Sequence, residues 1–237
     1  MNENKKNYLA CERKEVFLLL MFAAGMMGAY TFILRGGVFC NAQTANFVMM
    51  AVYIGSGMYS QGLYYLIPVC AYFMGTVVSE LLPNPVKKIH LFRWDTYLVA
   101  FEILVLFGIG WIPLSVNHHI VQVMINFIAS MQYNTFRQAE SIPMATTFCT
   151  NHLRQTGIGI VRFLRKNDTK ALSKGMSHLS MLISFVLGGI VEAFFCSLLL
   201  EKAIWMALIP LMINFILLAY SDLKEDRRDF SKVPSGH

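Results

Sequence analysis

The chain has 237 residues, of which 56% are hydrophobic and only 14% are charged, and its mean hydropathy is positive. A soluble protein carries about 25% charged residues, so this composition excludes a soluble globular domain and predicts an integral membrane protein. The net charge of +6 does not indicate nucleic-acid binding, because the basic residues are distributed by loop and not in a stripe with interleaved aromatic residues.

Six apolar runs predict membrane-spanning helices. A helix needs about 17–25 residues to cross a hydrocarbon core of about 30 Å. No A-x-A cleavage site follows the first run, so we expect it to stay in the mature protein as a span and not to be removed as a secretory signal. In chain order the runs are residues 16–34, 63–82, 97–113, 120–136, 176–200 and 203–220.

Two polar segments interrupt the apolar sequence at corresponding places. The first is RGGVFCNAQTAN, residues 35–46, after the first run, and the second is PMATTFCTNHLRQT, residues 143–156, after the fourth run. They can be aligned so that Thr44 meets Thr150 and Asn46 meets His152. Polar, backbone-breaking segments at matched depth in two halves of a membrane chain are typical of a transporter binding site, so we look for function here first.

The lysines and arginines predict the orientation. With six spans and the amino terminus inside, 18 of the 20 basic residues lie in cytoplasmic segments, and only Arg35 and Lys202 lie outside. The positive-inside rule therefore predicts that both termini are cytoplasmic. The fourth span then enters from the opposite side to the first, which makes the two halves antiparallel.

The predicted fold is an all-α integral membrane protein whose six transmembrane helices form a 3+3 inverted repeat. A short helical segment follows each polar segment, at residues 46–53 and 150–164. The first is too apolar for a loop and too short to cross, which indicates a half-helix, and the second is amphipathic and is expected partly in the cytoplasmic interface. The parts of this single domain are a cytoplasmic segment, 1–14, two three-span repeats, 15–113 and 118–221, and a cytoplasmic tail, 222–237.

Amide, carbonyl and hydroxyl groups are concentrated in the two polar segments. Neutral dipoles of this kind can coordinate a small polar or ionic solute. The alternative is that they satisfy the backbone of broken helices, and for His152 that it is solvated. The predicted substrate-binding residues are Asn41, Gln43, Thr44 and Asn46 from the first segment and Thr146, Thr147, Thr150, Asn151 and His152 from the second.

Three acidic residues, Glu80, Glu102 and Glu192, lie nearest to membrane depth. A carboxylate there is costly, so each is a functional candidate. Glu192 is the best placed and is predicted to couple an ion or a proton; the alternatives are a buried pair with Arg35 or an interhelical hydrogen bond. Arg35 itself could bind an anion, hold a carboxylate, or only mark a helix end.

Glu80 lies close to the cytoplasmic end of the second run. An ion pair with Lys87 or Lys88, or a snorkelling side chain, is the alternative to ion coupling there.

Other chemistry has little support in the sequence. The five cysteines include no CxxC pair and lie mostly in apolar segments, and the adjacent His118 and His119 have no further ligands, so we expect no disulfide, metal or cofactor. GxSxG, HExxH and paired-aspartate signatures are absent, so the chain is not expected to be an enzyme.

The stretches GMMGAYTFILRGGVFCNAQTANFVMM and SMQYNTFRQAESIPMATTFCTNHLRQT resemble the YoaK family of bacterial membrane proteins, a domain of unknown function. The resemblance covers nearly the whole chain and implies six spans with transporter-like symmetry in the bacterial cytoplasmic membrane, but no substrate. Two positions depart from the family pattern: Gly28 stands at an acidic position and Ala45 at a glycine. The matching positions are Gly25, Ala29, Gly36, Gly37, Asn41, Thr44 and Asn46 in the first motif and Met131, Gln132, Thr146, Thr147, Thr150 and Asn151 in the second.

The favoured hypothesis is a small secondary transporter or permease in the lipid bilayer, which binds a small polar or ionic solute near the midplane between the two segments. Six spans are few for a carrier, so a homodimer is expected. One alternative is a non-transporting partner or sensor whose basic loop, residues 154–174, docks a soluble protein. The other is an intramembrane enzyme that acts on lipid.

Overall fold

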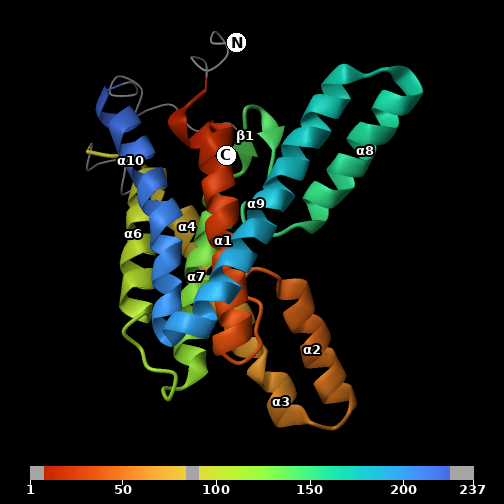
Figure 1. Cartoon of the computed structure of the whole chain (residues 1–237). Helices are drawn as coiled ribbons and strands as arrows, with labels where there is room; N and C mark the ends of the chain where they lie inside the picture. Colours follow the sequence, from red (N-terminus) through yellow and green to blue (C-terminus); the bar gives the residue numbers. More distant parts are fainter. Residues whose placement is uncertain (1–7, 84–90, 225–237) are drawn as a thin grey trace.

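The computed structural model describes residues 8–83 and 91–224, and almost all regular structure in them is helical (Figure 1). The structure confirms a helical fold and adds one short antiparallel hairpin, in which Ala139 pairs with Ile142. The elements are η2 (Ala10–Glu12), α1 (Lys14–Leu34), α2 (Gln43–Gly55), α3 (Tyr59–Tyr64), α4 (Leu66–Leu81), α6 (Trp94–Ile109), α7 (His118–Thr135), β1 (Gln138–Ala139), β2 (Ile142–Pro143), α8 (Thr150–Lys166), α9 (Thr169–Leu199), η4 (Leu200–Ala207) and α10 (Leu208–Lys224).

Helix α1 lies at the centre of the bundle, where it packs mainly against α9 and also against α10. Its sequence is apolar on every side, which is the pattern of a helix that is buried all round. Phe17, Leu20, Met21 and Met26 are fully buried in the core that α1 shares with α6, α7 and α10. On the other side of the bundle α4 packs along α7.

Three helical stretches of the described residues are long and apolar enough to cross a membrane, namely Lys14–Leu34, Tyr59–Leu81 and Thr169–Lys224. The last of these reverses direction at Leu200, whose φ of 50° ends α9, so that η4 and α10 run back along the bundle. The predicted spans at residues 97–113 and 120–136 correspond to α6 and α7, which are helical. Helix α6 is apolar but has only 16 residues, and α7 has 18 residues but is less apolar.

Large apolar side chains cover much of the outer surface. A soluble monomer rarely exposes a contiguous apolar patch of more than a few hundred Å², so this surface indicates a membrane protein. Examples with more than half of the side chain exposed are Phe73, Leu104, Val186, Ile190, Phe194 and Ile216.

A helical hairpin follows each polar segment. Helix α2 turns into α3 through Gly57, whose φ of +77° suits glycine, and α8 turns into α9 through Asn167 in the left-handed conformation and Asp168, which caps Ala171 N at 2.9 Å. The predicted helices at residues 46–53 and 150–164 are therefore present and slightly longer. The two hairpins project from opposite ends of the bundle (Figure 1).

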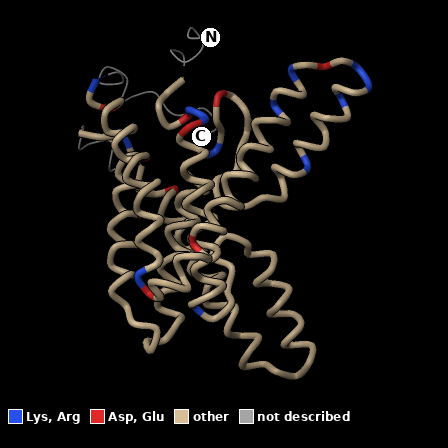
Figure 2. The backbone as a smooth tube through the Cα atoms, in the orientation of Figure 1, with Lys and Arg blue, Asp and Glu red and all other residues tan. Residues whose placement is uncertain are grey.

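Basic residues gather at one end of the molecule. Figure 2 shows most described Lys and Arg residues at the end where α1 begins and α10 ends, and along the α8–α9 hairpin. Arg35 and Lys202 lie at the opposite end, just after α1 and within η4. Seven of the basic residues on which the predicted orientation rests lie outside the described residues: Lys5, Lys6, Lys87, Lys88, Arg227, Arg228 and Lys232.

Two glycines allow the helices to cross at backbone contact. A Cβ on Gly188 of α9 would collide with the carbonyl of Phe22 in α1, and a Cβ on Gly75 of α4 would collide with the carbonyl of Phe127 in α7. Both crossings join helices that are distant in sequence.

We expect Gly188→Ala to lower the thermal unfolding midpoint in detergent, because the added methyl group must push α1 and α9 apart. Overpacking of this kind costs about 1–3 kcal/mol. Gly108→Ala in α6 is the matched control, since a Cβ there meets no atom within 4 Å, and alanine is favoured in a helix by about 0.5–1 kcal/mol. Equal midpoints for the two variants would contradict the close crossing.

Candidate functional site

The first polar segment begins at Arg35, which is fully buried. Its guanidinium donates to the hydroxyl of Tyr30, at 3.0 and 2.8 Å, and to the carbonyls of Ile112, at 2.6 Å, and Pro113, at 3.1 Å. The predicted pairing with Glu192 is not present, because these oxygens occupy the donors of Arg35. The arginine fastens the end of α1 to the loop before α7, and it is not free to hold an anion.

Amide side chains tie the first polar segment to α7. Gln43 donates to Asn126 Oδ1 at 2.8 Å, and Asn46 donates to Gln43 Oε1 at 3.1 Å. Asn41 turns the other way and donates to the carbonyl of Ala24 in α1 at 3.1 Å. The segment is thus held between α1 and α7.

The second polar segment is tied to α7 as well. Gln132 donates to the carbonyl of Thr146 at 3.2 Å. His152, at the start of α8, places Nε2 2.9 Å from the carbonyl of Ala145 and Nδ1 2.9 Å from Nδ1 of His178 in α9. Both histidines are buried.

The two segments, far apart in the sequence, both hydrogen-bond to the same section of α7. Their contacts Asn126 and Gln132 are six positions apart, which is about 9 Å along a helix. Tyr72 of α4 lies next to Thr147 of the second segment and within electrostatic range of Cys40 of the first. The distance between the segments is therefore far less than a membrane thickness.

Several oxygens in this region have no hydrogen-bond partner among the described residues. A buried polar group without a partner costs about 1–3 kcal/mol, so these atoms are positions for water or for a ligand. Amide oxygens only accept hydrogen bonds, which means that the fitting ligand carries N–H or O–H groups or a positive charge. The atoms are Oδ1 of Asn46, Oε1 of Gln122 and Gln132, and Oγ1 of Thr146 and Thr147.

Three of the predicted binding residues are not part of this cluster. Thr44 and Thr150 are exposed, and Asn151 is half-buried with Oδ1 accepting from Arg154. Residues two positions apart on a helix point about 200° away from each other, so when Asn46 and His152 face inward, Thr44 and Thr150 face outward. The aligned pairs of the two segments therefore share the same burial.

The acidic candidates separate into two kinds. Glu192 and Glu102 are fully buried, and their carboxylate oxygens have no hydrogen-bond partner among the described residues. Glu80 is exposed and pairs with Arg137 at 3.0 Å, while its expected partners Lys87 and Lys88 lie outside the described residues. Glu80 joins the ends of α4 and α7, and the two buried carboxylates remain candidates for ion or proton binding.

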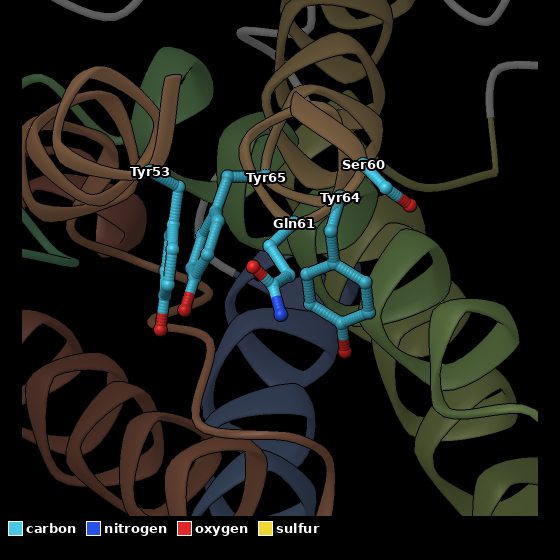
Figure 3. A pocket seen from close by; sticks show the side chains of 5 residues that line it. All are labelled: Tyr53, Ser60, Gln61, Tyr64 and Tyr65. Atoms are coloured by element: carbon cyan, nitrogen blue, oxygen red, sulfur yellow. The ribbon is translucent and has the colours of Figure 1, made fainter. Parts of the chain in front are cut away.

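A cavity of about 280 Å³ adjoins the first polar segment (Figure 3). It is lined by Tyr53, Tyr64 and Tyr65 together with Ser60 and Gln61, and the rings of Tyr53 and Tyr65 stack with centroids 5.9 Å apart. The cavity lies at the α2–α3 hairpin.

The tyrosine cavity is connected to the amide cluster through Gln122. Gln122 donates both to the hydroxyl of Tyr64 and to the carbonyl of Arg35, the latter at 2.6 Å. Gln122 precedes Asn126 by one helical turn, so both lie on the same face of α7. This spacing is the sequence pattern that could have indicated Gln122 as a site residue. No local pattern indicated His178 or Tyr72, which depend on which helices meet.

A family of proteins of unknown function, DUF1275, matches residues 16–217. The chain belongs to the DUF1275 family. YoaK, which the two motifs resemble, is the same family. Searches of the curated proteins and of the solved structures found no match for the DUF1275 chain.

Family membership and the apolar helices together indicate a membrane protein, and the family supplies no substrate. Among the described residues of the DUF1275 chain, no three His, Cys, Asp or Glu side chains are grouped so that they could hold a metal ion.

Burial lowers the pKa of His152 below its ordinary value, and the Ala145 carbonyl acts in the opposite direction. The folded DUF1275 chain therefore prefers neutral His152. This contribution to stability is complete above the unfolded-state pKa of about 6.5 and is lost as the pH falls below it.

We expect the thermal unfolding midpoint to decrease as the pH is lowered from about 7.5 to about 5. The substitution His152→Gln should make this decrease with pH, the slope, smaller. His118→Gln, in another loop, is the control and should keep the wild-type slope. The measurement is a series of unfolding scans in one detergent, and an unchanged slope in His152→Gln contradicts the assignment.

Proposed function

We propose that this DUF1275 protein is a small secondary transporter or permease that binds a small polar or ionic solute between its two polar segments. The observation that carries the proposal is that both segments hydrogen-bond to α7 six positions apart and leave buried oxygens there without partners. Interrupted segments that converge in this way are typical of transporter binding sites.

The unpartnered atoms favour a particular class of solute. Three amide oxygens and two hydroxyls suit a neutral solute with several donors, or a cation. Arg35 donates to carbonyl and phenol oxygens, so most of its N–H groups are already engaged by the protein and are not directed to an anion. Glu192 and Glu102 would supply the negative charge or the proton for coupling.

The proposal includes six spans arranged as a 3+3 inverted repeat. In its support, α1 packs on α9 while α4 packs on α7, and each crossing places a glycine of one half against a phenylalanine carbonyl of the other. The α2–α3 and α8–α9 hairpins at opposite ends are the corresponding half-helix units (Figure 1). Alternating access would then be movement of one three-span half against the other.

The proposal also places the protein in the bacterial cytoplasmic membrane with both termini inside, and as a homodimer because six spans are few. The gathering of basic residues at the end where α1 begins and α10 ends supports this orientation (Figure 2).

No catalytic step is part of the proposal. The ring nitrogens of His152 contact His178 and the carbonyl of Ala145, so no carboxylate orients this histidine as a base. Burial raises the pKa of Cys149 to about 11, which keeps the thiol protonated and poorly nucleophilic.

Uptake into proteoliposomes tests the proposal, with a panel of monovalent cations, amines, polyols and amino acids, and with anions for contrast. We expect Thr147→Val to raise the half-saturating concentration of the transported solute by about two- to tenfold, because one hydroxyl contact is lost. Thr44→Val is the matched control, since Thr44 is exposed on α2. Uptake of no panel member above protein-free vesicles, or equal loss in both variants, contradicts the proposal.

One observation favours a second candidate, a non-transporting partner or sensor protein. The α8–α9 hairpin projects from the bundle and exposes Arg165, Lys166 and Lys170 at its tip, where a soluble protein could dock. A folded protein without uptake activity that retains a soluble partner through this tip would support this candidate.

A further inference from the structure

A second cavity, of about 230 Å³, lies inside the α8–α9 hairpin, where β2 closes one side. Its polar lining consists of Gln155 and Arg162 from α8 and Lys174 and His178 from α9, and its other walls include Ile142 and Pro143. It is separate from the tyrosine cavity and shares none of its residues.

Backbone contact between α8 and α9 fixes the floor of this cavity. A Cβ on Gly159 would lie 2.6 Å from the carbonyl oxygen of Ala171 and 2.9 Å from Cα of Gly175, so only glycine allows the helices to approach so closely. Thr156 adds a hydrogen bond to the carbonyl of Gly175 at 3.3 Å. The two helices thus hold Arg162 and Lys174 at the same opening.

The two cations at the opening have no counter-charge among the described residues. Neither Arg162 nor Lys174 forms a hydrogen bond or an ion pair with the described residues, and no acidic residue lines the cavity. The nearby Asp168 already accepts from Ala171 N as the cap of α9. Positive charge that faces a polar cavity without a carboxylate is the arrangement that binds a phosphate or another oxyanion.

His178 adds an acceptor to the inner wall. Because Nε2 of His152 contacts a carbonyl, that nitrogen carries the proton, and Nδ1 of His152 accepts from Nδ1 of His178. Nε2 of His178 is then unprotonated and makes no hydrogen bond to the described residues. It can accept from the P–O–H group of a phosphate that retains one proton.

The surface around the cavity places it at the level of lipid headgroups. Helix α8 is amphipathic, with Leu153, Val161 and Leu164 exposed beside its basic residues. Such a helix lies in the membrane interface with its basic side chains among the lipid phosphates.

We propose that this cavity, lined by Arg162, Lys174 and His178, is a binding site for a terminal phosphate group. Arg162 and Lys174 contact the phosphate oxygens from the two helices, and His178 accepts its proton. The phosphate belongs either to a lipid headgroup or to a soluble phosphate compound, and both sources share the same recognition. The site does not depend on the transport activity proposed above.

Binding measurements on the full chain in neutral detergent test the site. The probes are dioctanoyl phosphatidic acid, dioctanoyl phosphatidylcholine and inorganic phosphate. Native mass spectrometry detects the bound probe, and a titration with each probe gives its dissociation constant. The test variant is Arg162→Gln/Lys174→Gln, and the control is Arg165→Gln/Lys170→Gln, which removes the same charge from exposed positions on the same hairpin outside the cavity.

We expect the wild-type chain and the control to bind phosphatidic acid more tightly than phosphatidylcholine, and the test variant to bind it about tenfold or more weakly. Competition by inorganic phosphate indicates a soluble source, and its absence indicates the lipid. Equal binding by the two double variants, or no binding of phosphatidic acid or inorganic phosphate to the wild-type chain, overturns the proposal. All four substituted side chains are exposed, so the variants are expected to fold. An unchanged thermal unfolding midpoint shows that a variant has lost the site and not its fold. The single variant Lys174→Gln provides the same comparison with one substitution.

Discussion

The structure depends on hydrogen bonds that α7 makes to backbone and side chains outside its own helix. Both polar segments leave helical geometry inside an apolar chain, where unpaired backbone groups cost several kcal/mol each. Gln122 meets the carbonyl of Arg35, Asn126 accepts from Gln43, and Gln132 donates to the carbonyl of Thr146. Three amides on one helix therefore support two breaks that lie far apart in the sequence, and they hold both segments against α7.

The same amides explain why some hydrogen-bond acceptors at the site have no partner. An amide has more hydrogen-bonding capacity than one contact uses, so after Gln122 and Gln132 have donated to carbonyls their own oxygens remain without partners. The scaffold and the candidate binding site are thus built from the same residues. The buried guanidinium of Arg35 takes no part in this cluster, because it donates to the hydroxyl of Tyr30 and to the carbonyls of Ile112 and Pro113.

Much of this arrangement could be predicted from the sequence, because its signals are local. Polar residues marked both segments, with Gly36 and Gly37 in the first, and the ends of the following helices were marked by Gly55 to Gly57 and by Arg165 to Asp168. Predictions about particular side chains did less well. Thr44 and Thr150 were chosen with their neighbours, but a helix that begins at Gln43 or at Thr150 turns them outward.

Contacts between distant helices were beyond the sequence for a different reason. The alternative in which Glu192 pairs with Arg35 is not found, because the carbonyls of Ile112 and Pro113 accept from the guanidinium. His178 and Tyr72 lie at the site because α9 packs against α8 and α4 packs against α7. Such pairings depend on the packing of whole helices, and no local spacing encodes them.

The two glycine crossings, Gly188 on Phe22 and Gly75 on Phe127, also bear on how this molecule can change shape. Where side chains interdigitate, one helix can shift on another only in discrete steps, because packed interfaces are not continuously deformable. At the Gly188 crossing the nearest atoms of α1 are backbone atoms of Phe22, whereas at the Gly75 crossing the side chain of Ser130 also fills the space. The α1–α9 crossing therefore has less side-chain interlocking than the α4–α7 crossing.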